Sequence, residues 1–111
     1  MLKFETLQEF STSVCGTLLK RFCISKKGTT YTHTCELDTL KEVAHLIDDC
    51  QIYRRRDIIE ITGAPSSQVH VALQFLIDRC SVDYDEDDYL YGPPDVYADA
   101  MLEFEVLKAF K

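Results

Sequence analysis

A mostly α-helical α+β fold is predicted for this chain of 111 residues. Apolar residues recur at helical spacing in several segments, and the stretch 57–80 places a glycine and a proline between two such segments. After Cys80 the pattern changes to the alternation that is typical of a β-hairpin. A chain of this length, with 46% hydrophobic residues, buries one core, so a single domain over residues 1–111 is expected.

The first predicted element is an N-terminal helix over residues 5–23. Thr6 and Glu9 match a capping box, in which each side chain bonds a free backbone N–H. An apolar stripe follows at spacings of three and four residues: Leu7, Phe10, Val14, Leu18 and Phe22. The next segment, 25–37, contains a Lys-Lys-Gly turn and several threonines, so it is either a strand of the core or a mobile arm.

A second helix is expected to begin at Asp38 or Thr39, because both residues are good caps and Thr39 with Glu42 again fits the capping box. Its apolar positions include Leu40, Val43, Ala44, Leu46, Ile47 and Cys50. Residues 51–53 follow as a short extended piece.

The stretch 57–80 predicts a helix, a tight turn and a second helix over 66–79. Gly63 supplies the positive φ that ends the first helix, and Pro65 suits the start of the next. The buried face of the second helix is predicted to hold Val69, Ala72, Leu73 and Leu76. The outward face is predicted to hold Ser66, Ser67, Gln68, His70, Val71 and Gln74.

The last part of the chain predicts a hairpin over 82–91 and a helix over 95–110. Val82, Tyr84, Tyr89 and Tyr91 flank a polar centre. Gly92 and two prolines end that unit, and Asp95 is the expected cap of the helix. In order, helix, short strand, helix, turn, helix and hairpin form a winged helix over residues 38–92, with additional N-terminal and C-terminal helices.

The stretch 62–73 resembles the start of the recognition helix in IclR-type transcription regulators, which belong to the winged helix-turn-helix superfamily. Thr62, Gly63, Pro65, Val69 and His70 carry the resemblance. It implies a DNA-reading module in which residues 66–74 enter the major groove, while the hairpin touches an adjacent groove or the backbone.

The residues that we expect to bind DNA are Arg54, Arg55, Arg56, Ser66, Ser67, Gln68, His70 and Gln74. Arginines grip phosphates, and glutamine pairs with adenine. Each group also has a structural interpretation. The arginines could neutralise nearby aspartates, the serines could cap the helix, and the glutamines and His70 could be ordinary surface residues.

The distribution of charge favours a second interpretation. The net charge is −7, and residues 40–94 carry five Lys/Arg against eleven Asp/Glu. DNA-binding domains are usually basic, because phosphate contacts supply most of their affinity. The hairpin holds five carboxylates, Asp83, Asp85, Glu86, Asp87 and Asp88. These residues could instead form a docking surface for a basic protein partner.

Metal and catalytic sites are not expected. The acidic hairpin begins like a calcium loop, but its sixth place is Asp88 instead of glycine and its twelfth is Pro94. His33 and Cys35 lack a second ligand pair at zinc spacing. No motif of a hydrolase or a phosphate-binding loop occurs, so we expect no enzyme and no cofactor. A site in an unpredicted cleft is the third alternative.

The five cysteines form no CxxC pair, which favours a reduced, cytoplasmic setting. No apolar run reaches the roughly 20 residues of a membrane span, so no membrane partner is expected. The broad apolar faces of the terminal helices predict a homodimer through these helices. The sequence therefore predicts a small winged-helix protein that binds double-stranded DNA and regulates transcription, with helix 66–79 reading the duplex. The alternative is a winged helix that acts as a protein–protein interaction module through its acidic hairpin.

Overall fold

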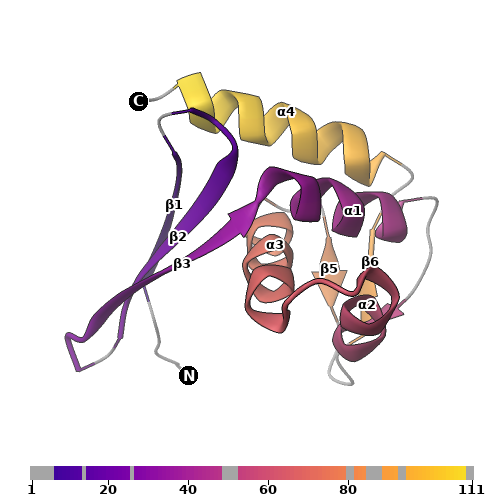
Figure 1. The fold of residues 1–111 in the computed structure, drawn as a ribbon, viewed down its shortest axis with the longest axis horizontal. Coiled ribbons are helices and arrows are strands. Elements are labelled where there is room, and N and C mark those ends of the chain that lie inside the picture. Colours follow the sequence, from indigo (N-terminus) through magenta and orange to yellow (C-terminus); the bar gives the residue numbers. More distant parts are fainter. Residues whose placement is uncertain are drawn as a thin grey trace.

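The computed structural model describes residues 7–13, 15–25, 27–48, 53–79, 82–84, 89–92 and 95–109, which form an α+β fold (Figure 1). The chain begins with three strands, β1 (Leu7–Thr12), β2 (Leu18–Ile24) and β3 (Thr30–Glu36). It continues with α1 (Leu37–Ile47), β4 (Tyr53–Arg54), α2 (Arg55–Thr62) and α3 (Ser66–Asp78). The last elements are β5 (Asp83–Tyr84), β6 (Tyr89–Tyr91) and α4 (Val96–Ala109).

The predicted N-terminal helix over 5–23 is wrong, because its described residues form two antiparallel strands. β1 and β2 pair in an unbroken register, and alternate side chains of β2 are buried. The helical spacing of the apolar residues is therefore a coincidence. In the sheet, Phe10 lies on the face that meets the helices and is 8% exposed, whereas Phe22 lies on the opposite face and is 37% exposed.

The turn between β1 and β2 explains why no helix forms here. Gly16 has a φ of 75°, a left-handed conformation that glycine adopts without a steric penalty. The Ser13 hydroxyl accepts hydrogen bonds from the backbone N–H groups of Thr17 and Leu18, at 3.2 and 3.0 Å. Serine and threonine favour such local bonds over helix formation, and an interior glycine costs a helix about 1 kcal/mol.

Within the segment 25–37, residues Thr30–Glu36 form a strand, which decides between the two interpretations that the sequence left open. β3 pairs with β2 along its whole length, from Thr30 opposite Ile24 to Glu36 opposite Leu18. The β2–β3 hairpin projects away from the helices at its far end (Figure 1). At its near end, β3 continues directly into α1.

Helix α1 begins at Leu37, one or two residues before the predicted start. Its N-cap is Glu36, which makes no side-chain capping bond. Thr39, predicted as a cap, is 8% exposed, and its hydroxyl donates to the Gln68 side chain of α3 at 3.0 Å. The predicted capping box of Thr39 is therefore wrong, because this hydroxyl connects two helices.

The turn between α2 and α3 agrees with the sequence-based prediction. Gly63 has a φ of 70°, and its N–H donates to the carbonyl of Ile59, which closes the end of α2. Pro65 directly precedes the first residue of α3. The four residues predicted to be buried are fully buried: Val69, Ala72, Leu73 and Leu76.

The outward position predicted for Val71 is wrong, because α3 is covered on a second side. Val71 and Phe75 are both fully buried. The rings of Phe10 and Phe75 meet edge to face, with centroids 5.3 Å apart, so the N-terminal sheet packs on α3. Helix α3 therefore has buried residues on two sides, because it lies between the N-terminal sheet and the other helices.

The predicted hairpin over 82–91 is present in the described residues as β5 and β6, which pair antiparallel. β4 joins the other side of β6, so the strand order of this sheet is β4-β6-β5. Of the predicted extended piece at 51–53, Tyr53 lies in β4, whereas residues 51 and 52 lie outside the described residues. The C-terminal helix is also confirmed, and α4 lies along α1 (Figure 1), where the rings of His45 and Tyr97 stack 3.7 Å apart.

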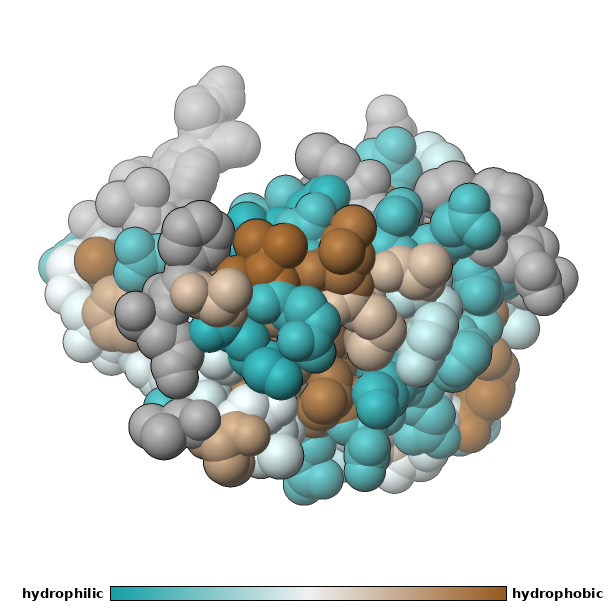
Figure 2. Space-filling model, turned by 90° about the horizontal axis from the view of Figure 1, so that it is seen from above, coloured by the Kyte–Doolittle hydropathy of each residue, from teal (hydrophilic) through white to brown (hydrophobic). Residues whose placement is uncertain are grey.

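The predicted dimer interface through both terminal helices cannot include the N-terminal helix, which is absent from the described residues. Helix α4 does expose Leu102 and Val106, at 63% and 45%. Figure 2, which views the molecule from the side of α4, shows hydrophobic groups within a mostly hydrophilic face. None of the described helices is both long enough and apolar enough to cross a membrane.

Candidate nucleic-acid interface

The first turn of α3 presents two hydroxyls at the surface. Ser66 and Ser67 are exposed. Pro65 occupies the N-cap position without a side-chain bond, and its carbonyl accepts from the N–H groups of Gln68 and Val69, at 3.0 and 3.1 Å. The serines therefore do not cap the helix, and their hydroxyls face solvent.

Gln68 is occupied within the fold. Its side-chain oxygen accepts a hydrogen bond from the backbone N–H of Glu36 at 3.1 Å and another from the Thr39 hydroxyl at 3.0 Å. This single side chain thus connects the end of β3, the start of α1 and the start of α3. Pairing with an adenine would require the same oxygen, so we exclude Gln68 from the candidate interface.

The open face of α3 is a narrow stripe. His70 and Gln74 are half-buried and lie one turn apart, in line with the exposed serines of the first turn. Packing of Val71 and Phe75 against the N-terminal sheet closes the adjacent side of the helix. A duplex therefore cannot surround α3 as it would surround a helix that lies deep in the major groove.

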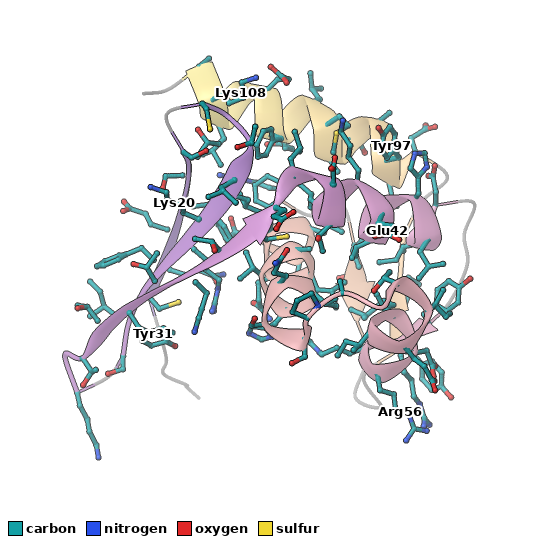
Figure 3. All side chains as sticks on the ribbon, viewed as in Figure 1. Lys20, Tyr31, Glu42, Arg56, Tyr97 and Lys108 are labelled. Carbon is teal, nitrogen blue, oxygen red and sulfur yellow. The ribbon has the colours of Figure 1, made fainter. Side chains whose placement is uncertain are left out.

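The three consecutive arginines lie in three different environments. The guanidinium of Arg54 lies 4.7 Å from the centre of the Tyr89 ring, and its backbone N–H donates to Asp57 at 3.3 Å. Arg55 is half-buried, and its Nη1 lies 3.0 Å from Nδ1 of His70. Arg56 is exposed on α2 and points away from the body of the molecule (Figure 3). Arg56 thus has the greatest access to a ligand.

Four nitrogen-rich side chains converge from four elements. We name Arg21 of β2, His33 of β3, Arg55 of α2 and His70 of α3 the cation cluster. Arg21 is 8% exposed, its Nε donates to the side chain of Gln8 at 2.7 Å, and it lies directly opposite His33 in the β2–β3 register. The packing of α3 on the sheet brings the strand residues to the helix residues.

His70 lies within electrostatic range of the other three groups. Burial lowers the pKa of His70 most, and electrostatic interactions with Arg55, Arg21 and His33 lower it further. No described carboxylate contributes to this shift. An arginine only donates hydrogen bonds, so Nδ1 of His70 accepts from Arg55 and the ring proton lies on Nε2. The cluster therefore presents positive charge and an N–H donor.

Arg21 and His33 are the candidate residues that the sequence analysis missed. The sequence predicted a helix over residues 5–23, which includes Arg21. That prediction gave no reason to expect Arg21 near α2 and α3. The sequence of residues 18–24 gives no clear signal, because Leu18, Phe22 and Ile24 on one face are as apolar as the residues that alternate with them. The single buried face of this strand appears only in the structure.

The acidic hairpin is only partly described. Asp83 is exposed on β5, whereas Asp85, Glu86, Asp87 and Asp88 lie outside the described residues. Of the five carboxylates predicted to bind a protein partner, the structure therefore describes Asp83 alone. Cys50 and Cys80 also lie outside the described part of the chain.

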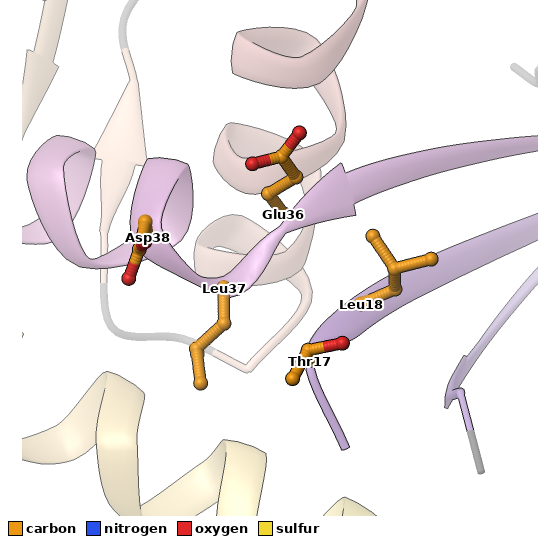
Figure 4. Close-up of a pocket in the computed structure, with 5 residues that line it drawn as sticks. All are labelled: Thr17, Leu18, Glu36, Leu37 and Asp38. Atoms are coloured by element: carbon orange, nitrogen blue, oxygen red, sulfur yellow. The ribbon is translucent and has the colours of Figure 1, made fainter. Parts of the chain in front are cut away.

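Two surface depressions occur away from the cation cluster. One of about 380 Å³ lies where β2 begins and β3 meets α1, and Glu36 and Asp38 give it an acidic lining (Figure 4). Another of about 300 Å³ lies beside Phe22, on the face of the sheet turned away from α3. Neither has the positive charge that phosphate binding requires.

Within the described residues, no three His, Cys, Asp or Glu side chains gather as metal ligands. Comparison of the sequence with protein-family models and with curated proteins, and of the fold with solved structures, found no match. We therefore infer a function from the geometry of the cation cluster and its surroundings.

Proposed function

We propose that α1 to β6 form a winged helix and that the protein binds duplex DNA through the cation cluster. Support for the winged helix comes from the element order α1-β4-α2-α3-β5-β6 and the strand order β4-β6-β5. In this arrangement α3 corresponds to the recognition helix and β5-β6 to the wing. A role in transcription regulation stays a prediction.

The convergence of Arg21, His33, Arg55 and His70 carries the proposal. Guanidinium groups donate hydrogen bonds to phosphate oxygens, and the Nε2–H of His70 supplies a further donor. Arg56 extends this surface along α2, and the exposed hydroxyls at the start of α3 extend it along that helix. Such a surface follows the sugar–phosphate backbone.

Contacts to bases are expected to be few. The N-terminal sheet covers one side of α3, and Gln68 is held by Glu36 and Thr39. Only His70 and Gln74 remain in a position to meet base edges. We therefore expect the protein to bind DNA with weak sequence preference, because phosphate contacts carry no sequence information directly.

Fluorescence anisotropy with a random-sequence DNA duplex, measured across a series of salt concentrations, tests the proposal. We expect binding that weakens steeply with salt. The double variant Arg55→Gln/Arg56→Gln should bind more weakly and reduce the log–log salt slope by about 1.8, because each phosphate contact contributes about 0.9.

Lys20→Gln is the control, because it removes a positive charge that lies away from the cation cluster. Lys20 neighbours Arg21 in β2, so its side chain points to the opposite face of the sheet (Figure 3). This variant should bind like the unchanged protein. Absence of binding at low salt, equal loss in both variants, or binding to RNA alone would each contradict the proposal.

The covered side of α3 also favours a second candidate, a winged helix that binds a basic protein partner. A recognition helix packed against a sheet has less surface for DNA, and Asp83 is exposed on the hairpin. If DNA binding is absent, replacement of the hairpin carboxylates with Asn and Gln should abolish capture of a basic partner. Unchanged capture would contradict this candidate.

A further inference from the structure

The outer edge of the N-terminal sheet is formed by β3. The strand order is β1-β2-β3, so β3 has a paired neighbour on one side only. Residues Thr30 to Thr34 are all exposed, and this part of the strand extends beyond the helices (Figure 1). A strand in this position offers its backbone to another strand.

Two hydrogen bonds reveal which backbone groups point outward. The N–H of Leu37 donates to Thr17, on the side of β2, at 2.9 Å. The N–H of Glu36 donates instead to Gln68, on the outer side, at 3.1 Å. Because direction alternates along a strand, Thr30, Thr32 and Thr34 also present their N–H and C=O groups outward. None of these three residues has a backbone hydrogen bond to a described residue on that side.

This edge lacks the features by which proteins usually prevent strand pairing. Residues Thr30 to Cys35 include no lysine, arginine, aspartate, glutamate, proline or glycine. The β2–β3 register is continuous, so no bulge twists the edge away. Gln68 protects the edge at Glu36, but this protection ends before Thr34. The exposed segment is therefore open to pairing with another strand. The net charge of −7 on the chain does not protect it, because this charge lies on other segments.

We propose that two copies of this chain form a dimer by antiparallel pairing of their β3 strands, with the two-fold axis at Thr32. The segment Thr-Tyr-Thr-His-Thr is nearly palindromic. An axis at Thr32 places Thr30 opposite Thr34 of the partner subunit, so each outward N–H meets an outward C=O. An axis at Tyr31 or His33 would leave some of these groups unmatched.

The side chains are complementary in the same register. Tyr31 lies opposite His33 of the partner subunit in a pair without backbone hydrogen bonds, where side chains approach most closely. Within one chain these two rings already meet edge to face, 5.2 Å apart. On the other face, threonine lies opposite threonine, which is a favourable cross-strand pair. A second copy therefore fits this edge in both backbone and side chains.

The symmetry has a consequence that rests on the proposed function. A two-fold axis perpendicular to the sheet leaves the same face of both copies on one side. The pairing is antiparallel, so the two helical bodies lie at opposite ends of the paired segment. Both cation clusters would then face one side of a continuous sheet of six strands. The dimer itself does not depend on DNA binding.

Amide hydrogen exchange and sedimentation velocity on the full chain test the dimer. We expect dimer formation as protein concentration rises. The exchange of the backbone amides of Thr30, Thr32 and Thr34 should slow as the dimer forms. An amide exchanges only while its hydrogen bond is open, and the dimer would give these three amides a hydrogen bond. The amides of Tyr31 and His33 point toward β2, so they should be protected at every concentration. DNA is absent from both measurements, so their outcome is separate from that of the binding assay.

Thr32→Pro removes the central outward donor, and a proline is tolerated on an edge strand where its nitrogen faces away from the sheet. Thr32→Lys places two like charges opposite each other on the exposed face. Both variants should sediment as monomers, with Thr32→Val, which retains the N–H and the shape, as the dimeric control. If the proline variant is misfolded by circular dichroism, the lysine variant decides.

Several outcomes would overturn this inference. They are a monomer at all concentrations, a dimer without slowed exchange at the three threonines, and a dimer that persists in Thr32→Lys. A dimer that is lost in Leu102→Lys but not in Thr32→Lys would instead assign the interface to α4.

Discussion

The described cysteines lie in opposite chemical environments. Cys15 is exposed, and hydrogen bonds from the side chains of Thr17, at 2.9 Å, and Ser13 lower the pKa of its thiol to about 7. Cys35 is buried in the core, where burial and the nearby charge of Glu36 raise the pKa of its thiol to about 12. The reactive form of cysteine is the thiolate, so these two thiols should differ greatly in reactivity.

We therefore expect iodoacetamide at pH 7.5 to modify Cys15 before Cys23 and Cys35 in the native protein. Cys23 and Cys35 should react only after unfolding, because both are buried. Peptide mass spectrometry over a time course measures the order. Thr17→Val should slow the modification of Cys15, because it removes the bond that contributes most to the lowered pKa. Equal rates in the two proteins would show that this bond does not control the thiol.

His70 predicts a dependence of stability on pH. Its pKa in the folded protein lies below the ordinary value of 6.5, so the unfolded chain binds more protons as pH falls through that range. Stability from this group is complete above pH 6.5 and decreases as pH falls toward the folded pKa. Urea unfolding at pH 7.5 and 5.5 should show a smaller loss in His70→Gln than in the unchanged protein. An identical loss would contradict the prediction.

Among the elements, the junction of β3, α1 and α3 depends on one side chain. Gln68 accepts hydrogen bonds from Glu36 and Thr39, and Thr39 is nearly buried. Replacing Gln68 with alanine would leave these two donors without their acceptor, which is more costly than the loss of an exposed bond.

We expect Gln68→Ala to reduce the free energy of unfolding by about 2 kcal/mol, since each lost bond costs on the order of 1 kcal/mol. Gln74→Ala is the matched control in the same helix, with an expected change within about 0.5 kcal/mol. Urea denaturation of both variants provides the measurement. A similar effect in the two variants would mean that the connection through Gln68 adds no stability.

The complete fold joins two layers, the N-terminal sheet and the helical body, through one continuous hydrophobic core. This core includes residues from the sheet, from all four described helices and from β6. The contact of Phe10 with Phe75 lies at the boundary between the layers. The sheet is thus an integral part of the structure.

A double-mutant cycle on Phe10 and Phe75 tests this connection. We expect Phe75→Ala to cost about 3–5 kcal/mol, because it leaves a cavity in the core. The coupling between the two rings should be about 0.5–1.5 kcal/mol beyond the burial of their surface. Thermal and urea unfolding of the single and double variants measures both quantities. Additive effects would show that the sheet and α3 are energetically independent.

The sequence predicted best those parts whose structure depends on neighbouring residues. The αL conformation of Gly63, the four buried positions of α3, the hairpin and α4 follow from local backbone preference and short-range periodicity. The N-terminal sheet was not predictable in the same way. Spacings of three and four between apolar residues also occur by chance in strands, and the buried face of this sheet packs on α3, which lies far along the chain.

The candidate site shows the same division. By itself, the sequence determined the arginine run at the start of α2, the surface serines and the glycine turn, because each is local. Only the tertiary structure decided that Val71 is buried, that Gln68 is held within the fold, and that Arg21 and His33 join Arg55 and His70. The physical reason is that burial, hydrogen-bond partners and charge clusters depend on which distant surfaces pack together, and here the sheet packs on α3.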